Sequence, residues 1–280
     1  WGDPSFALGY AIAHELGRAE ELESLRTSAA GLRPAIAACW NKTSNFFLVR
    51  DRDSHLSLKG SQVLTRLGPG TIRLKKAFKH PVRLLFRVVE ASQATRGVEI
   101  RILGQSSARV VREQLECKDF HWNMDVATAT SRQVYSSLEE IEVTGLNRSD
   151  KLIIRSVDTM QEDQTGFLPL WAGLLDEKQT AALLQEKLFN PQAFWFPAGV
   201  SSMALTPGEL FSQESLEVHF PWNQLIGEGL LACGKRLETA GLVTRLIETS
   251  ITSLKRQGAF YNSYRAVNGV GMGERNSLRG

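Results

Sequence analysis

Residues 98–103 read Val-Glu-Ile-Arg-Ile-Leu, and apolar and charged side chains alternate through most of this stretch. A period of two places the apolar side chains on one face of a β-strand and the charged ones on the other. Other apolar runs rich in β-branched residues lie around it, separated by glycines and polar turns, at 82–89, 109–115, 133–143 and 152–157. Their spacing predicts a small antiparallel β-sandwich over residues 56–158.

The segments on either side of this region have helical periodicity instead. Apolar residues recur every three or four positions over residues 5–38, which predicts two amphipathic helices with breaks near Gly17 and Gly31. Further helices are predicted at 176–184, which opens on acidic residues, and at 222–237 and 239–255. Residues 1–55 and 159–280 are therefore expected to form one helical domain into which the sandwich is inserted. Paired helices joined by aromatic, glycine-rich loops are typical of a toroid of helical hairpins, although a plain bundle has a similar pattern.

Composition is that of an ordinary globular protein with enough chain for two cores: 280 residues, 42% hydrophobic and 22% charged. The 33 basic and 30 acidic residues are interleaved, and the net charge is only +3. The basic cluster of Arg73, Lys75, Lys76 and Lys79 is interpreted as the solvated edge of a strand, so no nucleic-acid partner is expected.

The three cysteines, Cys39, Cys117 and Cys233, are too far apart in sequence for a zinc motif or a disulfide framework. This usage favours a reducing, cytoplasmic location. No apolar run approaches 18 residues and no signal pattern opens the chain, so no membrane partner is expected. The lack of an initiator Met, together with an end at Gly280 that closes no element, predicts a fragment of a longer protein.

Three aromatic clusters lie at predicted helix ends or loops, at 166–173, 194–200 and 218–224. Their tryptophans, Trp171, Trp195 and Trp222, accompany amide or histidine side chains such as Asn223. A sugar packs its C–H face on an indole while its hydroxyls need planar donors and acceptors, which these clusters offer. The alternative is that each tryptophan belongs only to the hydrophobic core.

The last segment, 259–276, is expected to be a loop rich in polar and aromatic groups. Its glycines resemble a phosphate loop only superficially, because no strand precedes them and no Lys-Ser or Lys-Thr follows, so nucleotide binding is not predicted. Glu274 and Arg275 form either a surface ion pair or a polar group aimed into a cleft. No Gly-x-Ser-x-Gly motif occurs, and His219, the one histidine in a candidate cleft segment, is interpreted as structural. Neither a metal nor another cofactor is predicted.

Six motifs in this order resemble the (α/α)6 toroid of family 63 glycoside hydrolases and the related debranching-enzyme and trehalase-like hydrolases. They are Asp-Pro-x-Phe at 3–6, Cys-Trp-Asn at 39–41 followed by Phe-Phe-Leu-Val-Arg-Asp at 46–51, Phe-Leu-Pro-Leu-Trp-Ala-Gly at 167–173, Phe-Trp-Phe-Pro-Ala-Gly-Val at 194–200, Pro-Trp-Asn at 221–223 and Phe-Tyr-Asn-Ser-Tyr at 260–264. The resemblance covers residues 1–52 and 160–280. It implies a partial helical toroid interrupted by the sandwich.

The resemblance also implies metal-independent, inverting hydrolysis by two carboxylates. In the family the acid lies upstream of the Asp-Pro helix, and the base is a glutamate directly after the Phe-Tyr pair, where this chain has Asn262. An amide accepts no proton from water at neutral pH. Either Glu274 or another carboxylate has replaced the base, or the chain binds sugar without cleaving it, or the loop aligns differently. Sugar contacts are expected from Trp171, Trp195, Trp222, Asn223, Tyr261 and Arg275.

The leading hypothesis is an inverting glycoside hydrolase, of α-glucosidase or debranching type, that acts on oligosaccharides. The alternative is a non-catalytic carbohydrate-binding or assembly protein that retains the toroid. A third hypothesis, a helical scaffold with a sandwich for protein contacts, predicts that the tryptophan clusters are fully buried. The sequence predicts no oligomeric state.

Overall fold

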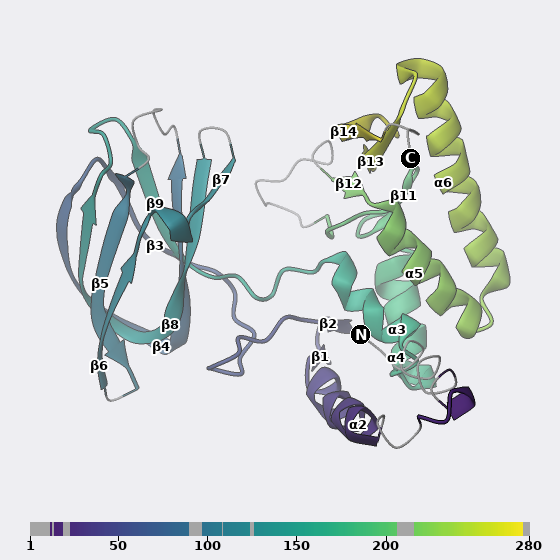
Figure 1. Ribbon diagram of the computed structural model, residues 1–280, viewed down its shortest axis with the longest axis horizontal. Coiled ribbons are helices and arrows are strands. Elements are labelled where there is room, and N and C mark those ends of the chain that lie inside the picture. The colour runs from purple at the N-terminus through teal and green to yellow at the C-terminus, as the bar shows by residue number, and fades with distance from the viewer. Residues whose placement is uncertain are drawn as a thin grey trace. The chain divides into compact units, whose positions relative to one another are not determined.

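A computed structural model describes residues 12, 14–18, 23–89, 97–107, 109–123, 126–205 and 216–276. Contacts divide the chain into two compact units, which Figure 1 shows. The helical unit comprises Trp1–Leu48 and Gln161–Gly280, and the sheet unit comprises Val49–Met160. The sheet unit is thus one continuous segment, and the helical unit is made of the two segments that flank it.

The sheet unit contains one antiparallel sheet with strand order β3-β9-β4-β8-β5-β6, and β7 pairs with β8 outside this path. The strands are β3 (Gln62–Leu67), β4 (Gly70–Val89), β5 (Glu99–Ser106), β6 (Arg109–Leu115), β7 (His121–Asn123), β8 (Val126–Thr144) and β9 (Lys151–Ser156). The five predicted strand runs all overlap these strands. Each neighbouring pair is hydrogen-bonded, so the described strands form one continuous sheet, and the two-layered sandwich stays a prediction.

The two long strands, β4 and β8, allow this single sheet to enclose a core. Their pairing shifts register between Arg73 and Lys76, between Ala77 and Val82 and again before Leu85, and such irregularities bend strands. The core side chains alternate along β5 as predicted, since Ile100 and Ile102 are buried and Arg101 is exposed. The strongly curved sheet in Figure 1 therefore wraps around its own apolar face.

The basic cluster lies along one edge of β4. Residues 70–83 of this strand pair with β8, whereas β9 joins β4 only from Leu84 onward. Arg73, Lys75 and Lys79 are exposed in the part that no described strand pairs on its second side. Lysines at an open edge discourage pairing with another chain, which agrees with the interpretation of this cluster as a solvated strand edge.

The helical unit consists of helices and short antiparallel pairs. Its helices are α2 (Glu23–Ala37), the 3-10 turn η4 (Gln164–Phe167), α3 (Leu168–Trp171), α4 (Glu177–Ala182), the π-helical turn η5 (Leu183–Leu188), α5 (Phe220–Ala232) and α6 (Arg236–Gln257). Its strand pairs are β1 (Trp40–Asn41) with β2 (Phe46–Phe47), β10 (Trp195–Phe196) with β11 (Gly199–Val200), and β12 (Glu217–Val218) with β13 (Phe260–Arg265), which also pairs with β14 (Gly271–Asn276). No helix in the described ranges is long and apolar enough to span a membrane.

Local signals fixed several of these boundaries. Asp176 caps α4 by accepting a hydrogen bond from the Gln179 N–H at 2.7 Å, which confirms the predicted acidic start. The chain turns after α5 at Gly234, whose φ of +75° suits glycine, so this helix ends before the predicted residue 237. Two expectations differ from the structure: α2 runs through Gly31 without a break, and most of the expected final loop is the hairpin β13–β14. The predicted first helix lies mostly outside the described residues.

The core of the helical unit is centred on three phenylalanine rings. Phe46, Phe167 and Phe194 are fully buried, with ring centroids 4.9–5.5 Å apart. Next to them α3 approaches α5 at Gly229, where a Cβ atom would lie 2.8 Å from the backbone N of Trp171. This close approach places Trp171 beside α5. Both α3 and α6 pack against α5, and the toroid of helical hairpins remains a prediction.

Candidate functional site

Trp171, at the end of α3, is linked to a carboxylate on α5 that the sequence did not single out. Its indole Nε1 donates a hydrogen bond to Glu228 Oε2 at 2.8 Å, and Gln224 Nε2 donates to Glu228 Oε1 at 3.1 Å. The Trp171 ring is half-buried, while Glu228 and Gln224 are exposed. A partly exposed indole, a carboxylate and an amide are thus fixed together at the surface of the helical unit.

Glu228 and Gln224 also line an open groove between α5 and α6 with a volume of about 450 Å³. Its walls are mainly apolar, with Phe220 and Pro221 at the start of α5 and Leu242, Val243 and Leu246 from α6. Polar groups therefore stand beside apolar walls, a combination that is common in ligand sites. The sequence analysis did not single out Glu228 because no motif includes it. The one signal was its spacing of four residues from Gln224, which places the two side chains on the same face of a helix.

Trp195, on β10, is occupied by protein contacts on several sides. The Arg245 guanidinium lies 4.8 Å from the ring centroid, and Phe189 meets the ring edge-on with centroids 5.1 Å apart. Arg245 also donates a hydrogen bond from Nη1 to the Phe196 carbonyl at 2.9 Å. The ring is half-buried against the core of the helical unit, so the structure gives Trp195 a packing role whether or not it also contacts a ligand.

Asn223 is an anchor between two elements. Its side chain is 1% exposed, and its Oδ1 accepts a hydrogen bond from the Val200 N–H at 2.8 Å. Its Nδ2 donates to the carbonyls of Val200 and His219 at 2.9 and 3.0 Å. The amide thereby ties the β10–β11 pair to the first turn of α5, and Asn223 also lines the α5–α6 groove although its side chain is almost fully buried. Its neighbour Trp222 is half-buried and is not among the lining residues of the groove.

The hairpin β13–β14 carries the remaining predicted site residues. Tyr261 lies across Gly271, where a Cβ atom would come within 2.0 Å of the ring, and its N–H donates to the Tyr264 hydroxyl at 3.1 Å. Tyr264 is itself buried and stacks on Phe220 of α5 with centroids 4.7 Å apart. These contacts fix the base of the hairpin against the start of α5.

Asn262 lies exposed at a bulge of this hairpin. The pairing passes from Tyr261↔Arg275 to Ser263↔Met272, so Gly273 and Glu274 together face the single residue Asn262 across the hairpin. Gly273 has a φ of +74°, as the first residue of a G1-type bulge requires. The backbone of Glu274 is therefore next to the position where the resembled family has its base. The side chains of Glu274 and Arg275 lie outside the described residues.

His219, at the N-cap of α5, has its Nε2 atom 3.6 Å from Glu217 Oε2. This pair is about one third exposed and joins β12 to the helix start. Among the described side chains, no three His, Cys, Asp or Glu residues gather into a group that would hold a metal ion.

Comparison with known proteins gives partial likenesses to solved structures. No protein-family model and no curated protein matches the chain. The neutral trehalase from Saccharomyces cerevisiae is similar at 21% identity and a TM-score of 0.34, over 41% of this chain and 23% of that one. The GH63 mannosylglycerate hydrolase from Thermus thermophilus, in complex with glucose, is similar at 24% identity and a TM-score of 0.32, over 42% of this chain and 27% of that one.

An uncharacterized conserved protein from the same bacterium, Thermus thermophilus, is similar at 25% identity and a TM-score of 0.32, over 41% of this chain and 27% of that one. The chain thus spans about a quarter of the length of these neighbours. Two of them carry the names of sugar hydrolases. The function is inferred below from this chain's own residues.

Proposed function

We propose that this chain is part of an inverting glycoside hydrolase of helical-toroid type, with α-glucosidase or debranching-like activity on oligosaccharides. The observation that supports sugar binding is that Gln224 and Glu228 line the α5–α6 groove, and that Glu228 is also hydrogen-bonded to the indole of Trp171. Each carboxylate oxygen of Glu228 accepts one hydrogen bond, from Trp171 or from Gln224. Each oxygen keeps a further lone pair that can accept a hydrogen bond from a sugar hydroxyl. The adjoining indole offers an apolar surface for the C–H face of the sugar.

The proposed catalytic part is the bulge of the β13–β14 hairpin. Inverting hydrolysis needs a carboxylate that activates water on the far side of the sugar from the acid. Glu274, whose backbone faces Asn262 across the bulge, is proposed to supply this carboxylate, and in the resembled family the acid lies upstream of the Asp-Pro helix. Trp195, Trp222, Tyr261 and Arg275 are proposed as further sugar contacts. Asn223 acts behind them by holding β11 on α5.

The alternative function is carbohydrate recognition without cleavage. It is favoured by the exposed amide of Asn262 at the position of the family's base, because an amide cannot take the proton from the attacking water. In this case the groove and the hairpin would bind an oligosaccharide and release it unchanged.

The test is a sugar-release assay of the full-length protein on α-linked disaccharides and aryl glucosides, run beside Glu274→Gln and Asn262→Glu. Glu248→Gln, which changes an exposed carboxylate on α6, is the matched control. A hydrolase loses turnover in Glu274→Gln while it keeps sugar binding, and the control keeps both. If the parent binds sugar without releasing any, and Asn262→Glu confers turnover, recognition is the function. A parent that neither binds nor cleaves these sugars contradicts both proposals.

A further inference from the structure

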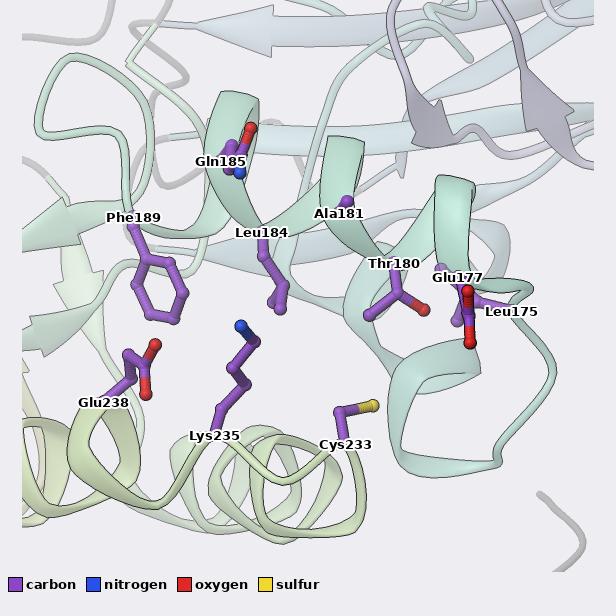
Figure 2. Close-up of a pocket in the computed structure, with 10 residues that line it drawn as sticks. All are labelled: Leu175, Glu177, Thr180, Ala181, Leu184, Gln185, Phe189, Cys233, Lys235 and Glu238. Atoms are coloured by element: carbon purple, nitrogen blue, oxygen red, sulfur yellow. The ribbon is translucent and has the colours of Figure 1, made fainter.

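A second pocket lies in the helical unit between α4–η5 and the turn that joins α5 to α6, with a volume of about 470 Å³ (Figure 2). Its lining residues are Leu175, Glu177, Thr180, Ala181, Leu184, Gln185, Phe189, Cys233, Lys235 and Glu238. None of them lines the α5–α6 groove. The pocket is at the C-terminal end of α5, and the hairpin that carries Asn262 contacts the other end of this helix through Phe220. For a helix of 13 residues, the two ends are roughly 20 Å apart.

The polar lining of this pocket combines charges of both signs with neutral groups. Figure 2 shows Lys235 between the carboxylates of Glu238 on one side and Glu177 on the other. An anionic ligand would meet two carboxylates, and a cationic one would meet the Lys235 ammonium. A neutral ligand rich in hydroxyls is suited to all three, because a hydroxyl donates to a carboxylate and accepts from an ammonium. Gln185 and Thr180 add groups that both donate and accept.

The apolar lining supplies a fixed aromatic surface. Phe189 is held edge-on by Trp195, whose ring lies under the Arg245 guanidinium, so these two side chains together orient Phe189. The widened turn of η5 is closed by a hydrogen bond from the Phe189 N–H to the Leu184 carbonyl at 2.9 Å. This π-helical turn brings Leu184, Gln185 and Phe189 to the same pocket. Such turns are frequent at functional sites.

We propose that this pocket is a second, non-catalytic binding site for a neutral polyhydroxylated ligand of monosaccharide or disaccharide size. Its volume of about 470 Å³ is within the usual range for small-molecule sites. An aromatic ring beside mixed donors and acceptors matches a molecule with a C–H face and a rim of hydroxyls. The inference rests on residues separate from the α5–α6 groove and does not require hydrolysis there.

Cys233 provides a direct readout, because it is exposed and lies in the pocket, whereas Cys39 and Cys117 lie elsewhere. Iodoacetamide labelling of each cysteine is followed by mass spectrometry with glucose, maltose or trehalose present, and separately with malate as an anion and choline as a cation. We expect at least one of the sugars to slow the labelling of Cys233 alone, and neither ion to do so. If no sugar slows it, or if malate or choline slows it instead, the proposal is wrong.

Two variants and two controls test the geometry. Phe189→Leu keeps an apolar contact with Trp195 but removes the ring, and Lys235→Met removes the central donor; each is expected to weaken the sugar's protection of Cys233 about tenfold. Lys178→Met, on the exposed side of α4, is the matched control for Lys235→Met and keeps full protection. Glu228→Gln is expected to keep full protection of Cys233 as well, because Glu228 lines the α5–α6 groove and not this pocket. Loss of sugar binding at the groove is thereby distinguished from loss of sugar binding at the pocket. Unchanged protection in both pocket variants, or its loss in Glu228→Gln, overturns the inference.

Discussion

Trp171 and Glu228, 57 residues apart in the chain, are joined by a hydrogen bond of 2.8 Å from the indole Nε1 to the carboxylate. The bond connects the end of α3 to α5 and fixes one carboxylate oxygen, while Gln224 fixes the other. A carboxylate held on both sides loses little further freedom when a ligand binds, and pre-organisation of this kind favours affinity.

The first prediction concerns this bond. Trp171→Phe keeps an aromatic ring but removes the N–H donor, so Glu228 becomes free to rotate away from the ring. We expect the affinity for an oligosaccharide to fall about tenfold, because a hydrogen bond to a charged group contributes at least about 1.5 kcal/mol, and about 1.4 kcal/mol corresponds to a factor of ten. Calorimetric titration of the parent and the variant with the oligosaccharide measures this change in affinity. Trp122→Phe, in the sheet unit, is the control and leaves the affinity unchanged; an equal loss in both variants would point to a general effect on folding.

The second prediction compares two glycines of α5. Gly229→Ala places a Cβ atom 2.8 Å from the Trp171 backbone N, which cannot move without displacing α3, so we expect a loss of stability of about 1–3 kcal/mol and weaker sugar binding. At Gly227 the nearest atom is Thr239 Cγ2 at 3.8 Å, an ordinary contact. Gly227→Ala should therefore stabilise by about 0.5–1 kcal/mol through helix propensity. Urea unfolding of the parent and both variants measures these changes in the free energy of unfolding. Equal changes in Gly229→Ala and Gly227→Ala would refute the close approach of α3 and α5.

The third prediction is a pH dependence in the sheet unit. Burial alone would raise the pKa of Asp51, but hydrogen bonds from Arg83, at 2.7 Å, and from the backbone N–H groups of Ser54 and Asp53 outweigh it and lower the pKa to about 2. A lowered carboxyl pKa stabilises the fold above the unfolded pKa, near 4, and this contribution is lost as the pH falls toward 2.

Asp51→Asn is therefore expected to cost about 2 kcal/mol at pH 7, an order-of-magnitude figure from the pKa shift. The difference in the free energy of unfolding between the parent and Asp51→Asn should shrink as the pH falls from about 4 to about 2. Unfolding free energies of parent and variant across this range measure it. A difference that stays constant with pH would show that Asp51 is not held ionised by Arg83.

The fourth prediction concerns the only tyrosine of the sheet unit. Tyr135 is fully buried, and its hydroxyl donates to Glu113 Oε2 at 2.8 Å, while Glu113 also accepts from the N–H groups of Arg132 and Gln133. Burial, followed by the charge of Glu113 and the hydrogen bond, raises the pKa of Tyr135 well above its usual value. The folded state therefore loses stability as the pH rises above about 10, where the unfolded tyrosine ionises.

Tyr135→Phe removes the donor to a nearly buried carboxylate, and we expect a loss of about 1–3 kcal/mol near pH 7. Above pH 10 the gap between parent and variant should narrow, because phenylalanine does not ionise. Chemical unfolding at pH 7 and pH 10.5 measures both effects. If the difference in the free energy of unfolding between parent and variant widens as the pH rises, the raised pKa of Tyr135 is contradicted.

Much of the fold was predictable because its signals are local. The alternation at 98–103 identified a strand with Ile100 and Ile102 buried, and Asp176 marked the start of α4. The site was less predictable. Aromatic clusters pointed to Trp171 and Trp195, yet only the structure separates an indole bonded to Glu228 from one enclosed by Arg245 and Phe189.

The sequence by itself indicated the main strands of the sheet unit and most helices of the helical unit, because periodicity and caps act within a few residues. It did not indicate the hairpin β13–β14, which was expected to be a loop. The tertiary structure alone decided which polar groups face outward together. Asn223 and Glu228 are on the same helix, but the amide is turned inward onto Val200, while the carboxylate meets Trp171 at the surface. The physical reason is that their partners come from distant segments, which the packing of α3 and β11 against α5 brings into contact.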